Sequence, residues 1–200
     1  MELGVGLMLV RPGEVIPVDA DIILLPGTKS TIGDLIFLRE QGWHIDIASH
    51  VRRGGSVLGL CGGYQMLGRK ISDPMGIEGS KTEIDGLGFL DVETILTSKK
   101  TLTSVTGKDT MFNTDISGYE IHIGKTTGSD CNRPIISLVK DGKVKFDGAS
   151  TYDGRIMGSY VHGIFASNSF RSAFLKNFGL KKENSIDFNW EVENTLDKLA

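Results

Sequence analysis

Cysteine is scarce in this chain of 200 residues, which contains only Cys61 and Cys131. Two cysteines do not make the dense disulfide framework that stabilises small secreted domains. The first fourteen residues, MELGVGLMLVRPGE, also lack the basic start and the long apolar stretch of a signal peptide. We therefore expect both thiols to be reduced and the protein to work in the cytoplasm.

Three further absences exclude classes of partner. Lysine and arginine number 22 against 25 acidic residues, a formal net charge of −3, so the chain lacks the basic surface that nucleic acids require. No run approaches the ~18 apolar residues of a membrane-spanning helix. No pair of cysteines or histidines has the spacing of a zinc site. We expect no nucleic acid, membrane or metal as a partner of this chain.

Glycine, in contrast, is abundant. The 26 glycines are roughly twice the ~7% of an average protein. They gather between apolar runs and form no repeat, which indicates tight turns within one globular domain.

The first half of the sequence alternates short apolar runs with helical segments. We expect buried strands at 4–10, 21–25 and 56–60, and helices at 31–41 and 43–53 that each end before a glycine. Strands alternating with helices are typical of a mainly parallel sheet with helices on both faces.

The second half is richer in strands. We expect a hairpin turn at Asp141-Gly142 and a loop over 97–117, where periodic signals are weak. A helix should cover 168–178, and the polar tail 181–200 should end in an amphipathic helix. The predicted strands cover 86–96, 119–126, 135–139 and 155–165.

Cys61 lies at a position suited to a nucleophile. The stretch GLCGG (59–63) has the spacing of the nucleophile elbow G-x-S-x-G, with cysteine in place of serine. Glycines two residues away on either side avoid a collision in the tight strand-to-helix turn. The start of the following helix should lower the thiol pKa below its usual ~8.5, and the N–H of Gly62 could stabilise an oxyanion. The alternative is that Cys61 is a small buried core residue.

A cysteine nucleophile needs a base. His162 ends an apolar strand, where sites of open α/β sheets gather, and is the first candidate. His122 is the second, on the same side of a strand as Glu120. We interpret His44 and His50 as exposed helix residues. A structure in which neither candidate is catalytic also fits the pattern.

Six motifs, taken in order, resemble the glutamine amidotransferase domain of the cobyric acid synthase family. The resemblance runs from about Asp21 to the helix after Phe165. It implies that residues 1–200 are one amidotransferase domain with the flavodoxin-like class I fold and an antiparallel extension. The motifs are LPGTKSTIGDL (25–35), LGLCGGYQMLG (58–68), DPMGIEG (73–79), GLGFLDVET (86–94), GYEIHIGKT (118–126) and GSYVHGIF (158–165).

The resemblance also implies roles for individual residues. Cys61 would attack the side-chain amide of glutamine, and His162 would move the proton. The N–H groups of Gly27 and Gly62 would form the oxyanion hole. Gln65 resembles a residue that contacts the substrate glutamine.

The residue that orients the histidine departs from the pattern of many class I enzymes. They carry a glutamate two residues after the histidine, where this chain has Ile164. Glu120 is our hypothesis for the orienting group of His162. The alternative is that Glu120 and His122 form a structural or interface pair.

The sequence contains no G-x-x-x-x-G-K-[ST] phosphate-binding loop. The resembled enzymes have an N-terminal synthetase domain that binds ATP and the corrinoid. We therefore expect this chain to be an excised fragment or a shortened gene product that lacks this domain. The resemblance also implies that the first strand of its own domain is missing. The chain would carry no cofactor itself, with ATP and Mg²⁺ on the absent domain. The implied reaction is glutamine hydrolysis that supplies ammonia for ATP-dependent amidation of adenosylcobyrinic acid a,c-diamide in cobalamin biosynthesis.

Three other functions fit the same residues. The chain could be the glutaminase subunit of another ATP-dependent ligase, such as one that amidates a cell-wall lipid precursor. It could be a Cys-His hydrolase of the same fold without a preference for glutamine. It could also be a domain that only binds a partner.

Overall fold

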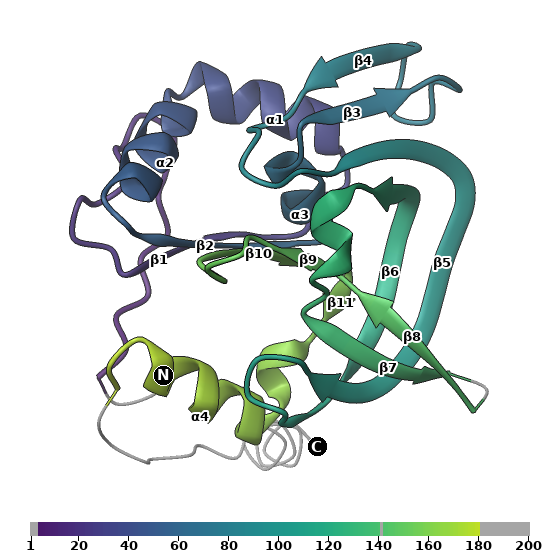
Figure 1. Ribbon diagram of the computed structural model, residues 1–200. Coiled ribbons are helices and arrows are strands. Elements are labelled where there is room, and N and C mark those ends of the chain that lie inside the picture. The colour runs from purple at the N-terminus through teal and green to yellow at the C-terminus, as the bar shows by residue number, and fades with distance from the viewer. Residues whose placement is uncertain (1–3, 141, 181–200) are drawn as a thin grey trace, which may run out of the picture.

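The computed structural model describes residues 4–140 and 142–180 of the chain. Its α/β fold contains one mostly parallel and one mostly antiparallel sheet, which stand beside one another (Figure 1). The amphipathic helix expected within 181–200 lies outside the described residues.

The smaller sheet is formed by short apolar strands that are covered on both faces. Its order is β1-β2-β10-β9, in which β1, β2 and β10 are parallel and β9 is antiparallel. Consecutive side chains of a strand point to opposite faces, so Val57 and Leu58 enter two different hydrophobic clusters. The strands are β1 (Ile22–Leu25), β2 (Ser56–Leu60), β9 (Ala149–Ser150) and β10 (Ile156–Ser159).

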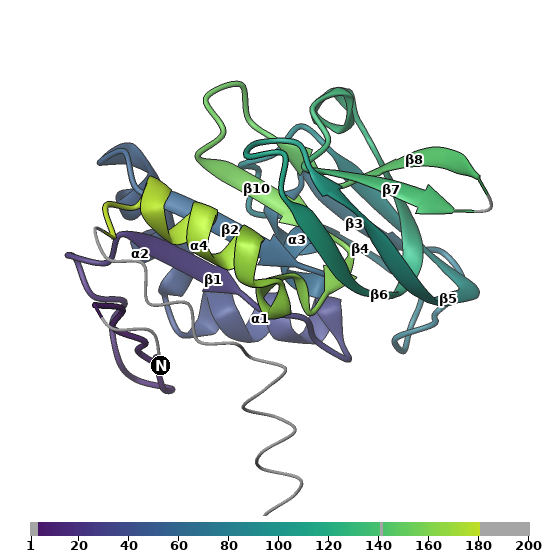
Figure 2. The ribbon, with the colours of Figure 1, turned by 90° about the horizontal axis from the view of Figure 1, so that it is seen from below.

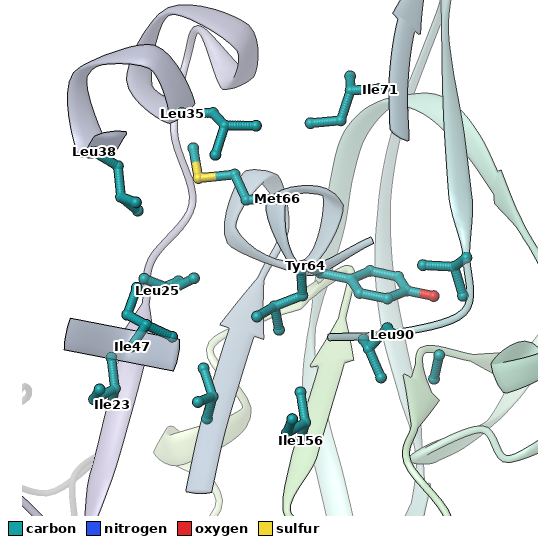
Figure 3. Close-up of a cluster of buried hydrophobic side chains, with 14 of the residues drawn as sticks. Ile23, Leu25, Leu35, Leu38, Ile47, Tyr64, Met66, Ile71, Leu90 and Ile156 are labelled. Atoms are coloured by element: carbon teal, nitrogen blue, oxygen red, sulfur yellow. The ribbon is translucent and has the colours of Figure 1, made fainter. Parts of the chain in front are cut away.

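Helices cover both faces of this sheet, as predicted (Figures 1 and 2). On one face lie α1 (Thr31–Glu40), α2 (Trp43–Arg52) and α3 (Gly62–Leu67). Leu35, Ile47 and Tyr64 from these helices are buried against the strands (Figure 3). On the other face lies α4 (Asn168–Asn177), which contributes Phe170 and Phe174 to the second cluster.

The second sheet is larger than the sequence indicated. The predicted loop over 97–117 is wrong, because most of it lies in the long hairpin of β5 and β6. Its apolar signal is weak because one face of the hairpin is exposed and carries Ser104, Thr106 and Lys108 beside Leu102. The sheet order is β11-β6-β5-β3-β4, and β7 pairs with both β5 and β8. The strands are β3 (Lys70–Asp73), β4 (Thr82–Asp85), β5 (Glu93–Asp109), β6 (Asp115–Thr127), β7 (Ile136–Lys140), β8 (Lys143–Asp147) and β11 (Val161–His162).

The predicted strand at 4–10 is also wrong. These residues form no strand, and Leu7, Met8 and Leu9 are exposed. Within the described residues this segment has no partner strand. An apolar run becomes a strand only where another strand accepts and donates its backbone hydrogen bonds, so the sequence pattern alone was insufficient.

Candidate active site

Cys61 lies in the sharp turn between β2 and α3, as the elbow pattern predicts. Its φ is 52° and its ψ is −111°, a left-handed backbone conformation that L-residues rarely adopt. A methyl group on Gly59 would lie 2.6 Å from the carbonyl oxygen of Gly63, and one on Gly63 would lie 2.1 Å from that of Leu25. The steric need for glycine on both sides of the cysteine is therefore confirmed.

His162 reaches the site because the strand predicted at 155–165 is divided into two. The buried carboxylate of Asp147 accepts hydrogen bonds from Ser159 Oγ at 2.5 Å and from the N–H of Tyr160 at 3.1 Å. The chain leaves the parallel sheet at this point. It continues as β11, which pairs antiparallel with β6 in the second sheet.

Cys61 and His162 meet at one backbone oxygen. The carbonyl oxygen of Ile121 lies 3.2 Å from Cys61 Sγ and 3.3 Å from His162 Nε2. A methyl group on Gly27 would lie 2.9 Å from Cε1 of His162 and 3.4 Å from Cβ of Cys61. The structure thus brings together three of the predicted site residues from the β1–α1 loop, the elbow and β11.

Tyr119 holds the plane of the imidazole. It lies opposite His162 in the β6–β11 register, and the two rings stack at 5.6 Å with an interplanar angle of 1°. Tyr119 and the carbonyl of Ile121 were not predicted as site groups. Tyr119 is part of a quoted motif, but its role depends on the register of β11 against β6.

The loop after β1 packs directly on the elbow. A methyl group on Gly62 would lie 2.3 Å from Cγ2 of Thr28 and 3.3 Å from its backbone nitrogen. Gly27 and Gly62 therefore flank Cys61, an arrangement that suits two oxyanion donors. Their role as donors stays a prediction.

The electrostatics of Cys61 differ from our expectation. Burial raises the pKa of its thiol, and the opposing effect of the Gly62 backbone N–H is smaller. We expected the helix start to lower this pKa. A carbonyl oxygen only accepts hydrogen bonds, so the resting sulfur donates to Ile121 as a neutral thiol.

Gln65 is 2% exposed, and its side-chain amide forms hydrogen bonds with three segments around the site. Its Oε1 accepts a hydrogen bond from Thr31 Oγ1 at 2.9 Å. Its Nε2 donates to the carbonyl of Ile123 at 2.9 Å and to the hydroxyl of Tyr160 at 3.1 Å. Both amide hydrogens are used within the protein, so a direct contact with substrate glutamine stays a prediction.

Glu120 does not orient His162, so this hypothesis is wrong. Glu120 lies opposite Val161 in the register, and its side chain points to the other face of the sheet from His162. Its carboxylate accepts hydrogen bonds from His122 Nε2 at 2.9 Å and Lys145 Nζ at 3.1 Å. These partners, His122 first, lower the pKa of Glu120 to about 2.

His122, the second base candidate, makes its contacts with groups other than the nucleophile. Its ring stacks on Tyr160 at 3.8 Å, and its hydrogen bond is to Glu120. Glu120 and His122 are therefore the structural pair that we weighed as the alternative. His50, interpreted as exposed, is buried, and its Nε2 donates to the carbonyl of Ser56 at 2.9 Å.

The start of α1 has a cap that the sequence analysis missed. The carboxylate of Glu78 accepts hydrogen bonds from the N–H of Thr31 at 3.0 Å and of Ile32 at 2.9 Å. Asp34, in the first turn of the same helix, contacts the hydroxyl of Thr28. Acidic residues stabilise helix starts, so the acidic Glu78 in the DPMGIEG motif is the feature from which this cap could have been predicted.

Two features are absent from the part of the chain that the structure describes. No helix there has both the length and the hydropathy needed to cross a bilayer. No three histidine, cysteine or acidic side chains there gather in an arrangement that could hold a metal ion.

Comparison with known proteins identifies the family. A family model described as a CobB/CobQ-like glutamine amidotransferase domain matches residues 2–170. The chain belongs to this family. The amidotransferase domain is 54% identical over 199 residues to the cobyric acid synthase of Rhizobium rhizogenes and 50% identical to that of Cereibacter sphaeroides. Each alignment covers 100% of this chain and 40% of the relative, so the domain spans less than half the length of these relatives.

Solved structures agree on the fold of the domain. A crystal structure of a glutamine amidotransferase matches with a TM-score of 0.51 at 16% identity, over 79% of this chain and 78% of that chain. The structure of PurLQS from Thermotoga maritima matches with a TM-score of 0.53 at 21% identity, over 89% of this chain and 81% of that chain. The class I amidotransferase fold predicted from the motifs is confirmed.

Proposed function

We propose that the chain is the glutaminase half of a cobyric acid synthase. The observation that carries this proposal is the meeting of Cys61 and His162 at one carbonyl oxygen beside Gly27. Relatives named cobyric acid synthase, at about 50% identity over the whole chain, favour this enzyme over a ligase for a cell-wall lipid precursor. A reducing cytoplasm suits its free thiol.

The reaction starts with a hydrogen on Cys61 Sγ and another on His162 Nε2. Cys61 and His162 both direct a hydrogen towards Ile121, so the imidazole must turn or exchange its tautomer as glutamine enters. It then takes the thiol proton, and the thiolate attacks the side-chain carbonyl carbon of glutamine. The stacked ring of Tyr119 limits the tilt of the imidazole during this step.

The negative charge formed by this attack lies on the former amide oxygen. The N–H groups of Gly27 and Gly62 would donate to it, and loss of one such donor usually costs about 10²–10³ in rate. The imidazolium returns its proton to the leaving nitrogen, and ammonia departs from a thioester on Cys61. Water then hydrolyses the thioester, so that glutamine and water give glutamate and ammonia.

The amidation step belongs to the rest of the enzyme in this proposal. The steps proposed for this chain use the thiol, the imidazole and water, and ATP and Mg²⁺ enter only in the amidation. These would bind a synthetase domain, which uses the ammonia to amidate the carboxylates of adenosylcobyrinic acid a,c-diamide. Glutamine is the substrate of this chain, and the synthetase domain and corrinoid are its partners.

The proposed chemistry is tested by covalent labelling with 6-diazo-5-oxo-norleucine, a glutamine analogue that alkylates the nucleophile. Peptide mass spectrometry should locate one label on Cys61, and excess glutamine should prevent it. Cys61→Ala should abolish labelling and glutamine hydrolysis, and His162→Ala should slow labelling near neutral pH. Cys131→Ala, which changes the other free cysteine, is the matched control. Glutaminase activity in Cys61→Ala would refute the proposal.

A further inference from the structure

The antiparallel sheet has one exposed face that is rich in apolar side chains. We call this the docking face. It carries five large apolar residues whose exposed fractions lie between 46% and 67%. They come from four neighbouring strands and are Leu102 of β5, Tyr119 of β6, Val139 of β7, and Val144 and Phe146 of β8.

The strand register places these residues on the same face. Val139 pairs with Val144 and with Thr106, and Thr106 also pairs with Ser117. Hydroxyl side chains fill the positions between the apolar ones: Ser104, Thr106, Ser117 and Ser137. None of these nine residues is charged.

Lys108 and Asp115 also share this face, at the turn end of the β5–β6 hairpin, where they form an ion pair at 2.9 Å. Lys145 of β8 lies on the opposite face, where it contacts the buried Glu120 of β6. A sheet that faces water normally places its polar and charged residues outward and its apolar residues inward. Contiguous exposed apolar surface marks interaction sites, and interface centres are poor in charge and rich in aromatic residues. The docking face has the composition of an interface.

The docking face also reaches the catalytic pair. Tyr119, one of its members, stacks on His162. Elsewhere Thr106, Ser117 and Val139 line a depression of about 570 Å³, which offers a place for a protruding side chain. A protein bound over this face would therefore lie next to the site that releases ammonia.

We infer that the docking face binds the part of the cobyric acid synthase polypeptide that accepts the ammonia. The inference rests on the proposed function. The domain spans 40% of the length of its relatives, so in these proteins a large further part is joined covalently to the amidotransferase domain. Ammonia diffuses away unless the accepting site is joined to its source, which favours a contact that adjoins His162.

The test uses a full-length enzyme in which this chain replaces the matching 199 residues of the Rhizobium rhizogenes relative. Val144→Glu adds a charge at the docking face. Ile45→Glu is the matched control, since Ile45 on α2 is 60% exposed and Val144 is 64% exposed. We expect Val144→Glu to lower glutamine-dependent amidation about tenfold or more, as for changes at an interface centre. Amidation from added ammonium salt and labelling of Cys61 should stay unchanged.

A second measurement does not depend on activity. A photo-crosslinking amino acid at position 144 should give crosslinks to the remainder of the full-length chain, and the same amino acid at position 45 should not. Normal glutamine-dependent amidation in Val144→Glu, no crosslink, or a crosslink only to a second copy would each overturn the inference. Absence of label on Cys61 in the unsubstituted enzyme would instead refute the proposed function.

Discussion

Gly27→Ala changes the site by a single methyl group. The structure places this methyl 2.9 Å from Cε1 of His162 and 3.4 Å from Cβ of Cys61. Carbon atoms normally lie about 3.5–4.0 Å apart, so the imidazole or the loop must move by roughly 0.6–1.1 Å. The φ of Gly27 is outside the left-handed region, so alanine causes no backbone strain. The substitution therefore acts on the geometry of the catalytic pair.

The expected effect on catalysis is large. A displacement of about 1 Å in a reacting group can cost on the order of 10²-fold in rate. We expect the kcat for glutamine hydrolysis to fall by about 10²-fold, while KM changes much less. The free energy of unfolding should fall by no more than about 1–3 kcal/mol, the usual cost of one added methyl in a packed site.

Steady-state glutaminase assays and urea unfolding measure these two effects separately. Gly6→Ala is the matched control, because a methyl there meets no atom within 4 Å. A normal kcat in a folded Gly27→Ala protein would mean that Gly27 does not pack against the reacting pair in solution. The assignment of the loop to the site would then be wrong.

Three further predictions concern buried polar groups. Iodoacetamide alkylation of Cys61 without glutamine should reach half its maximal rate at a higher pH than alkylation of free cysteine, because burial raises the thiol pKa. A midpoint at or below that of free cysteine would contradict this. Glu120→Gln should lower the free energy of unfolding by about 1–3 kcal/mol at neutral pH. In urea titrations this loss of stability should shrink as the pH falls from 4.5 towards about 2, because protonation of Glu120 removes the charged interactions that glutamine lacks. A loss that stays constant with pH would refute this prediction. Gln65→Leu should lower the free energy of unfolding by about 1–3 kcal/mol, because the buried partners of Gln65 lose their hydrogen bonds. Thermal unfolding measures this, and unchanged stability would count against it.

The sequence predicted those features that depend on local pattern. The helices at 31–41 and 43–53 and the strands at 21–25 and 56–60 agree with the structure to within one residue at each end. The elbow around Cys61 was also predictable, because the tight turn itself demands glycine at fixed spacing.

Features that depend on pairing between distant segments were not predictable. Glu120 and Tyr119 are adjacent in the sequence, and only the register of β11 decides which of them shares a face with His162. The apolar run at 4–10 resembles a strand, but no described strand pairs with it. His50 looked exposed because its partner, the carbonyl of Ser56, lies beyond the end of its helix.

The break at Tyr160 has a mechanical consequence. Cys61 is carried by the end of β2 in one sheet, and His162 is carried by β11 in the other. The two reacting groups thus belong to different sheets, and both contact the carbonyl oxygen of Ile121. A small displacement of one sheet relative to the other changes the distance between the sulfur and the imidazole without deforming either sheet. The reactivity of the Cys61 thiol therefore depends on how the two sheets are positioned relative to each other.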